Sequence, residues 1–200
     1  MEKQQKKKNQ ESRLGRQDWI DLGLVVLAEE GVEAVRIEPL AKRMNMTKGS
    51  FYWHFKNRND LLDAILAEWV ELDTNGIIEQ VDQLDAEPET KLLYLFELAY
   101  ADNDFIPGLA DGRIENAIRA WAKSDPKVAE LIEHVDQQRL NYTKALFLDI
   151  GFSEAEAMVR ARLAYYALVG EQTIGIAPHQ THRFDEIRMQ YDILTFHLNR

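Results

Sequence analysis

The sequence predicts an all-α protein. Apolar residues recur at the three- and four-residue spacing of amphipathic helices, and we find neither a convincing two-residue alternation typical of a strand nor an internal repeat. Turn-forming residues divide the chain into helical lengths. Of the 200 residues, 46% are hydrophobic, which is enough to build one large domain or two small ones.

The first predicted helix covers residues 16–30. Ile20, Leu24 and Leu27 are spaced so that they share one face, which can pack against a core. Gly31 follows at the position where a glycine commonly ends a helix. We therefore expect this helix to end at residue 30.

Two short helices are expected next, at residues 38–44 and 48–55. Pro39 belongs in the first turn of its helix, where a missing N–H costs nothing. Asn45 is expected in the tight turn between the two helices, because asparagine tolerates the left-handed conformation. Thr47 is placed to cap the second helix.

Longer helices are predicted after residue 59. Ser153 with Glu156 forms a capping box, which marks the start of one of them. The expected ranges are 60–78, 88–101, 109–123, 126–150, 153–174 and 184–198.

Two segments are too apolar for ordinary surface helices. Residues 92–100 contain a single charge, Glu97, and residues 161–170 carry Tyr165 and Tyr166 among small side chains. A helix that is apolar on every side must be buried in a core or against another chain. Little chain remains after the second segment to cover both of its faces, so we expect a homodimer through the C-terminal helices.

The composition excludes several classes of protein. Without cysteine there is no disulfide framework, cysteine zinc cluster or thiol nucleophile, which suits a cytoplasmic protein. The basic N-terminus is followed by no apolar segment of a signal peptide or of bilayer length.

The net charge of -10 is unevenly distributed. Residues 1–60 carry a charge of +3 and residues 61–200 a charge of -13. Any polyanion must therefore meet the N-terminal third. Residues 1–14 are expected to be a basic flexible tail.

The segment RIEPLAKRMNMTKGSFYWHFKNRNDLLDAI, residues 36–65, has the helix–turn–helix spacing that reading of a DNA major groove requires. Its second helix is rich in groups that suit a phosphate surface. These groups are the hydroxyls of Thr47 and Tyr52, the basic side chains Lys48, His54, Lys56 and Arg58, and Gly49, which lets the backbone come close to DNA.

This segment, from about residue 19 to residue 66, resembles the tetracycline-repressor (TetR/AcrR) family of bacterial transcriptional regulators, and TKGSFYWHFKNRNDLLDAI is close to that family's most diagnostic run. The resemblance implies a three-helix DNA-binding domain at residues 15–60 and a helical ligand-binding and dimerisation domain at residues 61–200. It also implies a repressor that binds a pseudo-palindromic operator as a dimer and is released by a small molecule.

The resemblance further implies individual DNA contacts. Lys48 and Gly49 match positions that approach base edges, and Arg36 is a plausible further phosphate contact. The positions that match phosphate contacts are Thr47, Ser50, Tyr52, His54 and Arg58. Lys56 is a candidate contact or a solvated charge at the helix end.

Two residues depart from the family pattern, and three aromatic residues need interpretation. Asn45 occupies the usual glycine position of the turn, and Glu38 puts an acid near the DNA face, where it serves the helix cap or shapes base choice. We interpret Phe51, Phe55 and Trp53 as core anchors rather than platforms for stacking bases.

The implied ligand pocket is harder to locate. Its candidates are polar or aromatic residues among apolar neighbours: Glu97, Asn116, Trp121, Tyr142, Tyr166 and Gln172. A buried Glu97 without a partner would favour a cationic ligand. If it pairs with Arg119 or Arg139, the pocket can be mostly apolar. Tyrosine and tryptophan also pack ordinary helical cores.

An enzyme is not expected. The sequence has no glycine-rich phosphate loop, no HExxH run and no nucleophile elbow, and we expect neither a cofactor nor a metal. His179 and His182 with Asp185 could bind a metal, but a solvated loop between helices is the simpler interpretation. The alternative function is an all-α small-molecule or partner-binding protein that does not bind DNA.

Overall fold

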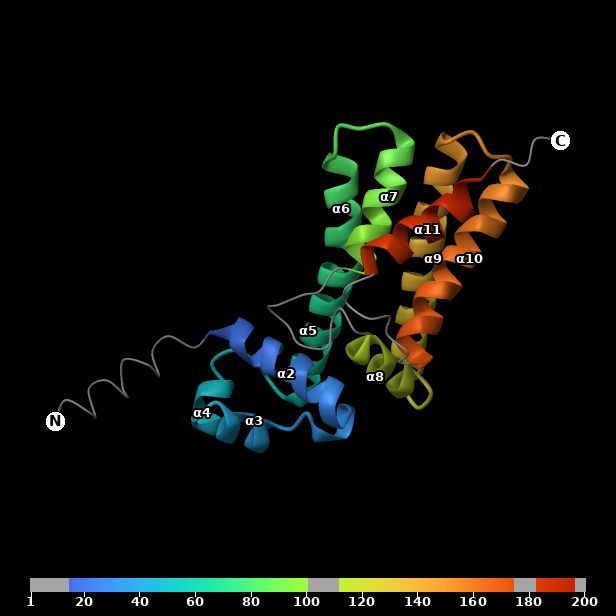
Figure 1. Cartoon of the computed structure of the whole chain (residues 1–200). Helices are drawn as coiled ribbons and strands as arrows, with labels where there is room; N and C mark the ends of the chain where they lie inside the picture. Colours follow the sequence, from blue (N-terminus) through green and yellow to red (C-terminus); the bar gives the residue numbers. More distant parts are fainter. Residues whose placement is uncertain (1–14, 101–111, 175–182, 197–200) are drawn as a thin grey trace.

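The computed structural model describes residues 15–100, 112–174 and 183–196. Within these ranges the regular elements are all helical, as the sequence predicts, and no strand occurs. Figure 1 shows a small group of helices, α2 to α4, at one end of the molecule and a larger bundle at the other, with α5 running between them. No helix among the described residues is long and apolar enough to cross a bilayer.

The N-terminal group consists of α2 (Arg16–Glu30), α3 (Ile37–Arg43) and α4 (Lys48–Phe51), packed against α5 (Arg58–Val70). The bounds of α2 are those predicted, and Ile20, Leu24 and Leu27 are buried on its inner face. A 3-10 turn at Val32–Ala34 joins α2 to the segment before α3.

The local signals around α3 and α4 are confirmed. Asn45 adopts φ 55°, the left-handed conformation that the tight turn requires. The Thr47 hydroxyl oxygen accepts a hydrogen bond of 3.3 Å from the Ser50 N–H and so caps α4. The helix is shorter than the predicted 48–55, because residues after Phe51 continue as a turn.

The expected helix 60–78 is longer than predicted and is interrupted. It begins with α5, passes through a π-helical segment at Glu71–Asn75 and continues as α6 (Gly76–Gln83). A Cβ atom on Gly76 would lie 3.0 Å from the Glu71 carbonyl oxygen, so a larger residue at position 76 would crowd the backbone of the π-helical segment. Single π-helical turns of this kind often occur at functional sites.

The C-terminal bundle contains α7 (Pro88–Ala99), α8 (Arg113–Ala122), α9 (Pro126–Asp149), α10 (Glu154–Ile174) and α11 (Arg183–Thr195). The predicted capping box is present, since the Ser153 backbone N–H donates to Glu156 Oε2 over 3.2 Å and the Glu156 backbone N–H donates to Ser153 Oγ over 3.4 Å. Parts of three predicted helices, residues 101, 109–111 and 197–198, lie outside the described residues, as do His179 and His182.

Two hydrophobic clusters hold the fold. One begins in the N-terminal group, with Trp19, Phe51 and Trp69, and continues into α8 and α9 through Ile118 and Val135. The other joins α6, α7, α9, α10 and α11. The first cluster therefore crosses the expected domain boundary at residue 60, and α8 packs against α2. α8 is therefore in direct contact with the N-terminal group.

Candidate nucleic-acid interface and ligand cavity

Buried aromatic rings hold the short helix α4 in place. Phe51 and Phe55 are buried, as predicted, and their ring centroids lie 5.3 Å apart. Trp19 of α2 meets the edge of Phe51, with 5.2 Å between ring centroids. Four residues cannot form a stable helix alone, so this packing and the Thr47 cap fix the orientation of α4.

The outer side of α4 and the turn after it are exposed. The exposed side chains are those of Thr47, Lys48, Tyr52, Trp53 and Lys56. The prediction that Trp53 is a core anchor is wrong, because 87% of its surface is accessible. Helical spacing was assumed as far as residue 55, but α4 ends at Phe51, and the turn points Trp53 away from the core. Trp53 is a candidate contact that sequence reasoning missed.

Gly49 has no structural reason to be glycine. A Cβ atom placed on it would meet only Thr47 Oγ1, at the ordinary contact distance of 3.6 Å. Its φ angle is not positive either, so its backbone conformation does not require glycine. The missing side chain leaves the α4 backbone open to close approach by a partner.

Glu38 and Lys48 form an ion pair between α3 and α4. The Lys48 ammonium donates to the carboxylate, and this hydrogen bond holds the pKa of Glu38 below its ordinary value. Both side chains are exposed. The acid that the sequence places near the DNA face is therefore bonded to the lysine expected to approach base edges.

The two predicted arginine contacts differ in their surroundings. Arg36 is exposed, and its Nε donates to the Glu33 carbonyl over 2.8 Å. Arg58 is half-buried and donates from Nε to the Val35 carbonyl over 2.6 Å and from Nη2 to the Val32 carbonyl over 2.5 Å. Its guanidinium thus fixes the segment between α2 and α3, which is a structural role that the sequence did not suggest.

The remaining predicted contacts, Ser50 and His54, are less exposed. The Ser50 hydroxyl donates to the Thr47 carbonyl over 2.7 Å. The backbone N–H of His54 donates to the Phe51 carbonyl over 2.9 Å. Both side chains are half-buried at the edge of the exposed surface. Like the exposed residues, both belong to α4 or the turn that follows it.

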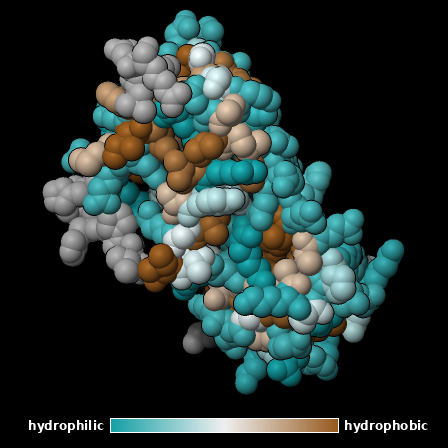
Figure 2. Space-filling view, turned by 90° about the vertical axis from the view of Figure 1, so that its right-hand side faces the viewer, coloured by the Kyte–Doolittle hydropathy of each residue, from teal (hydrophilic) through white to brown (hydrophobic). Residues whose placement is uncertain are grey.

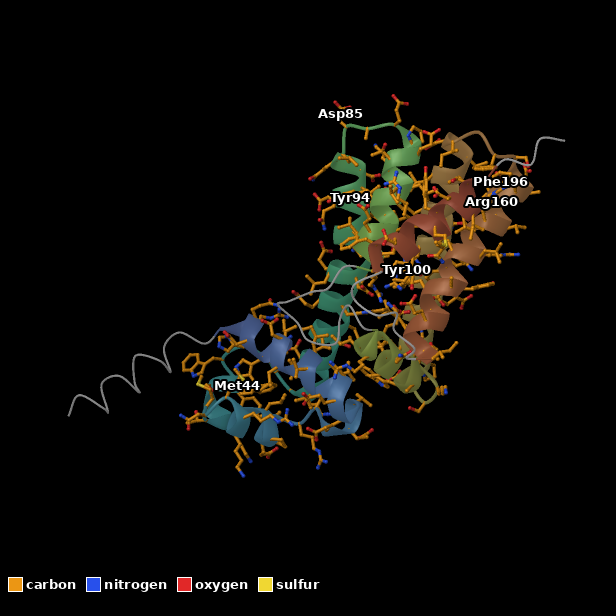
Figure 3. The ribbon with its side chains drawn as sticks, in the orientation of Figure 1. Met44, Asp85, Tyr94, Tyr100, Arg160 and Phe196 are labelled. Atoms are coloured by element: carbon orange, nitrogen blue, oxygen red, sulfur yellow. The ribbon has the colours of Figure 1, made fainter. Side chains whose placement is uncertain are left out.

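A cavity of about 70 Å³, partly open to solvent, lies in the C-terminal bundle. One part is apolar and is lined by Ile77, Ile78, Leu95, Phe96 and Leu168. Tyr100, labelled in Figure 3 at the end of α7, also lines it, and its hydroxyl donates to Gln190 of α11 over 3.3 Å. Burial raises the pKa of Tyr100 to about 12, so this hydroxyl stays protonated at neutral pH.

The other part of the cavity is charged. Arg139 of α9 bonds Glu115 of α8 over 2.7 Å and Asp73 of the π-helical segment over 2.9 Å. Its Nε donates to Thr74 over 2.9 Å. Burial alone would raise the pKa of Glu115, but the positive charges of Arg139 and Arg119 outweigh it and hold that pKa below its ordinary value.

Arg119 and Asp136 extend this cluster on the side of α10. Arg119 Nη2 lies 2.7 Å from Glu115 Oε1 and 2.6 Å from Asp136 Oδ1. The Tyr165 hydroxyl of α10 donates to Asp136 over 2.6 Å. Side chains of α8, α9, α10 and the π-helical segment are thereby joined in one network.

Only some of the predicted ligand residues lie at the cavity. Tyr142 and Gln172 line it, and Asn116 donates to the Gln172 carbonyl over 2.8 Å. Trp121 instead packs against the first hydrophobic cluster, which contains Trp19 and Phe51. Tyr166 points outward, and 61% of its surface is accessible. Glu97, half-buried on α7, is not among the lining residues.

The pairing considered for Glu97 is wrong. Arg119 and Arg139 bind Glu115, Asp136 and Asp73 instead. Sequence reasoning missed these carboxylates because each lies in an ordinary mixture of polar and apolar residues. Only the packing of three separate elements, the π-helical segment, α8 and α9, brings them together.

The comparisons with known proteins agree with this architecture. Residues 20–65 match the family of bacterial regulatory proteins described as the tetR family. The regulator AcrR of Shigella flexneri is 30% identical over 86 residues, which is 43% of this chain and 36% of that protein. The class D tetracycline repressor of Escherichia coli is 37% identical over 57 residues, or 28% and 26% of the two chains. The match thus spans about a third of the first relative and about a quarter of the second.

The likeness of fold extends further. A solved transcriptional regulator from Rhodococcus sp. Rha1 superimposes with a TM-score of 0.68 at 17% identity, covering 90% of this chain and 94% of that one. The N-terminal helix–turn–helix and the C-terminal helical bundle therefore form a fold shared along most of the chain.

Proposed function

By its N-terminal domain this chain belongs to the tetR family of bacterial regulatory proteins, and we propose that it is a transcriptional repressor that binds a pseudo-palindromic operator as a homodimer and is released by a small molecule. The observation that carries this proposal is the exposed face of α4, which the buried Phe51 fixes next to α3. It acts in the cytoplasm, where its operator lies, without catalysing a reaction.

On DNA, α4 enters the major groove and α3 lies across it. Lys48 and Gly49 meet base edges, because they stand at the exposed start of α4 and Gly49 permits close approach. Phosphates are held by the residues around them: Arg36, Thr47, Ser50, Tyr52, His54 and Lys56. Arg58 contributes by fixing the segment before α3, since its guanidinium is bonded there.

The dimer forms through α10 and α11. Figure 2 shows hydrophobic side chains gathered on the side of the molecule that α10 and α11 occupy. Exposed apolar residues of these two helices are Val159, Leu163, Tyr166, Ile174, Phe184, Met189 and Ile193, and the exposed Phe196 directly follows α11. Arg160 of α10 donates to the carbonyl of Phe196, directly after α11, over 3.0 Å and so ties the two helices together; both residues are labelled in Figure 3. A patch of this extent favours an interface with a second copy.

The effector occupies the cavity in the C-terminal bundle. Asp73 and Thr74 line it and belong to the helical segment that continues directly from α5. Glu115 lies on α8, which packs against α2 of the DNA-binding domain. A ligand that binds better to a second arrangement of these helices shifts the population toward it. The two copies of α4 then no longer match successive major grooves, about 34 to 36 Å apart.

Selection of DNA fragments from the source genome by the purified full-length protein tests this function. The proposal expects one enriched pseudo-palindromic sequence, and the genes beside it indicate the regulated process. No enrichment, with or without small molecules added, contradicts it. That result favours the alternative, an all-α small-molecule or partner-binding protein that does not bind DNA.

A further inference from the structure

The charged part of the cavity holds more negative than positive charge. Its charged lining residues, among those that the structure describes, are Asp73, Glu115 and Arg139. With the adjoining Arg119 and Asp136, the network contains three carboxylates and two guanidinium groups. If all of them are ionised, the network carries one uncompensated negative charge. A buried charge without a partner is costly, and a counter-charge stabilises it.

The positive groups of the network are already occupied. Arg139 donates to Glu115, Asp73 and Thr74, and Arg119 donates to Glu115, Asp136 and Tyr165. An anionic ligand would have to displace these carboxylates and leave them buried without a counter-charge. A cationic ligand needs no displacement, because the unbalanced charge is negative.

The rest of the cavity suits an apolar body attached to the cation. Ile77, Ile78, Leu95 and Leu168 supply aliphatic surface. The aromatic rings of Phe96, Tyr100, Tyr142 and Tyr165 also line the cavity, and such rings attract a cation at short range.

We propose that this cavity binds a hydrophobic monocation, an ammonium group on an apolar or aromatic body, and that Asp73 with Glu115 receives the positive charge. This inference deepens the proposed function, because it rests on the cavity being the effector site. It assigns a charge to the effector and names the residues that select it.

The protonation of Asp73 supports this assignment. Burial raises the pKa of Asp73 to about 7 against the lowering effect of Arg139, and nearby Glu115 raises it further. Arg119 of α8, Asp136 of α9 and Tyr165 of α10 complete the charged and titratable surroundings. In the free protein a proton can therefore balance the excess charge, and a bound cation takes over that role. Cation binding is consequently expected to release a proton.

The test uses three probes of matched shape and different charge: 4-phenylbutyl-trimethylammonium, 4-phenylbutan-1-ol and 4-phenylbutanoate. Their binding to the full-length protein is measured by isothermal titration calorimetry. We expect the cation to bind at least about tenfold more tightly than either of the other probes. The quaternary ammonium does not titrate, so any pH dependence belongs to the protein. Its Kd should fall about tenfold between pH 6 and pH 8, with proton release.

Two variants locate the charge. Asp73→Asn keeps the shape and the hydrogen-bond acceptor but removes the charge, and we expect the Kd of the cation to rise about tenfold and its pH dependence to disappear. Asp63→Asn is the matched control: Asp63 is an exposed carboxylate on α5 that pairs with Lys127 and is not among the lining residues. This variant should bind the cation as the wild type does.

Several results overturn the inference. They are tighter binding of the alcohol or the carboxylate, a Kd for the cation weaker than about 1 mM, or an unchanged Kd in Asp73→Asn. The wild-type pH series decides the matter even if Asp73→Asn does not fold. The calorimetry contains no DNA, so its outcome is independent of the DNA selection. If the protein binds the cation but enriches no operator, the repressor is refuted and the ligand class stands. An operator without cation binding would do the reverse.

Discussion

The ammonium group of Lys48, the first residue of α4, is bonded to the carboxylate of Glu38 in the first turn of α3. The pair links the two helices of the helix–turn–helix on its exposed side. An exposed pair of this kind contributes little to stability, because solvent screens the two charges. Its main effect is on DNA binding. Lys48 has to leave Glu38 to reach a base edge, and the Glu38 carboxylate repels the phosphates of the DNA.

Replacing Glu38 by glutamine should therefore strengthen DNA binding. Without the carboxylate, Lys48 is free and one source of repulsion is gone, so we expect the Kd for DNA to fall about three- to tenfold. Discrimination between operator and random duplex should weaken, because Lys48 is no longer restrained. Fluorescence anisotropy with both duplexes measures the two effects. Glu79→Gln, the same change on α6, is the control, and an equal effect of both variants would exclude a role for the pair.

Trp53 should matter for DNA binding and not for stability. Because 87% of its surface is accessible, Trp53→Ala should change the free energy of unfolding by less than about 0.5 kcal/mol. The same variant should raise the Kd for the operator about tenfold, through lost contact with the DNA. Phe51→Ala gives the contrast, since emptying a buried aromatic site costs about 3 to 5 kcal/mol. Unchanged operator affinity in Trp53→Ala would remove it from the interface.

Local features of the fold could be predicted from the sequence because their causes are local. Gly31, Asn45, Thr47 and Ser153 each act on the backbone within four residues, and the structure has each where it was expected. The family resemblance added the order of domains, which local rules do not contain. Helix ends that depend on packing, such as the early end of α4 at Phe51, were missed.

The charged cavity could not be predicted, because its causes are distant in the sequence. Asp73 and Arg139 are paired across 66 positions, and Glu115 of α8 meets Arg139 of α9 across 24 positions. The π-helical segment that carries Asp73 has no known sequence signal here. Glu97 drew attention only because its neighbours are apolar, and that pattern did not indicate where its side chain lies.

The raised pKa of Asp73 makes stability depend on pH in a defined direction. The folded-state pKa of about 7 lies above the ordinary value of 3.8, so the folded protein holds the proton more tightly than the unfolded chain. This contribution to stability is complete below about pH 3.8 and is lost as the pH rises through 7. The free energy of unfolding of the wild type should therefore fall between pH 6 and pH 8.

Asp73→Asn should not show this loss. Relative to the variant, the wild type should lose on the order of 1 kcal/mol between pH 6 and pH 8. Urea denaturation at both pH values measures the difference, with Asp63→Asn as the control. A stability difference that does not change with pH would mean that Asp73 does not titrate in this range.

A charge on the exposed face of α10 should break the dimer. Leu163 is 55% accessible in the single chain, so Leu163→Glu should leave the fold of the subunit intact. At an interface the buried carboxylate would be unpaired, and we expect the variant to sediment as a monomer. Leu148→Glu makes the same change on α9, outside that face, and should remain dimeric. A dimeric Leu163→Glu would place the interface elsewhere.

The central claim is that the face formed by α4 reads a DNA sequence. It is tested most directly by the Kd of the wild-type protein for its selected operator and for a scrambled duplex of equal composition, at salt concentrations from about 50 to 200 mM. We predict that the operator binds at least about a thousandfold more tightly and that its affinity falls steeply with salt as counterions are released. Equal, salt-independent Kd values for the two duplexes would contradict the account.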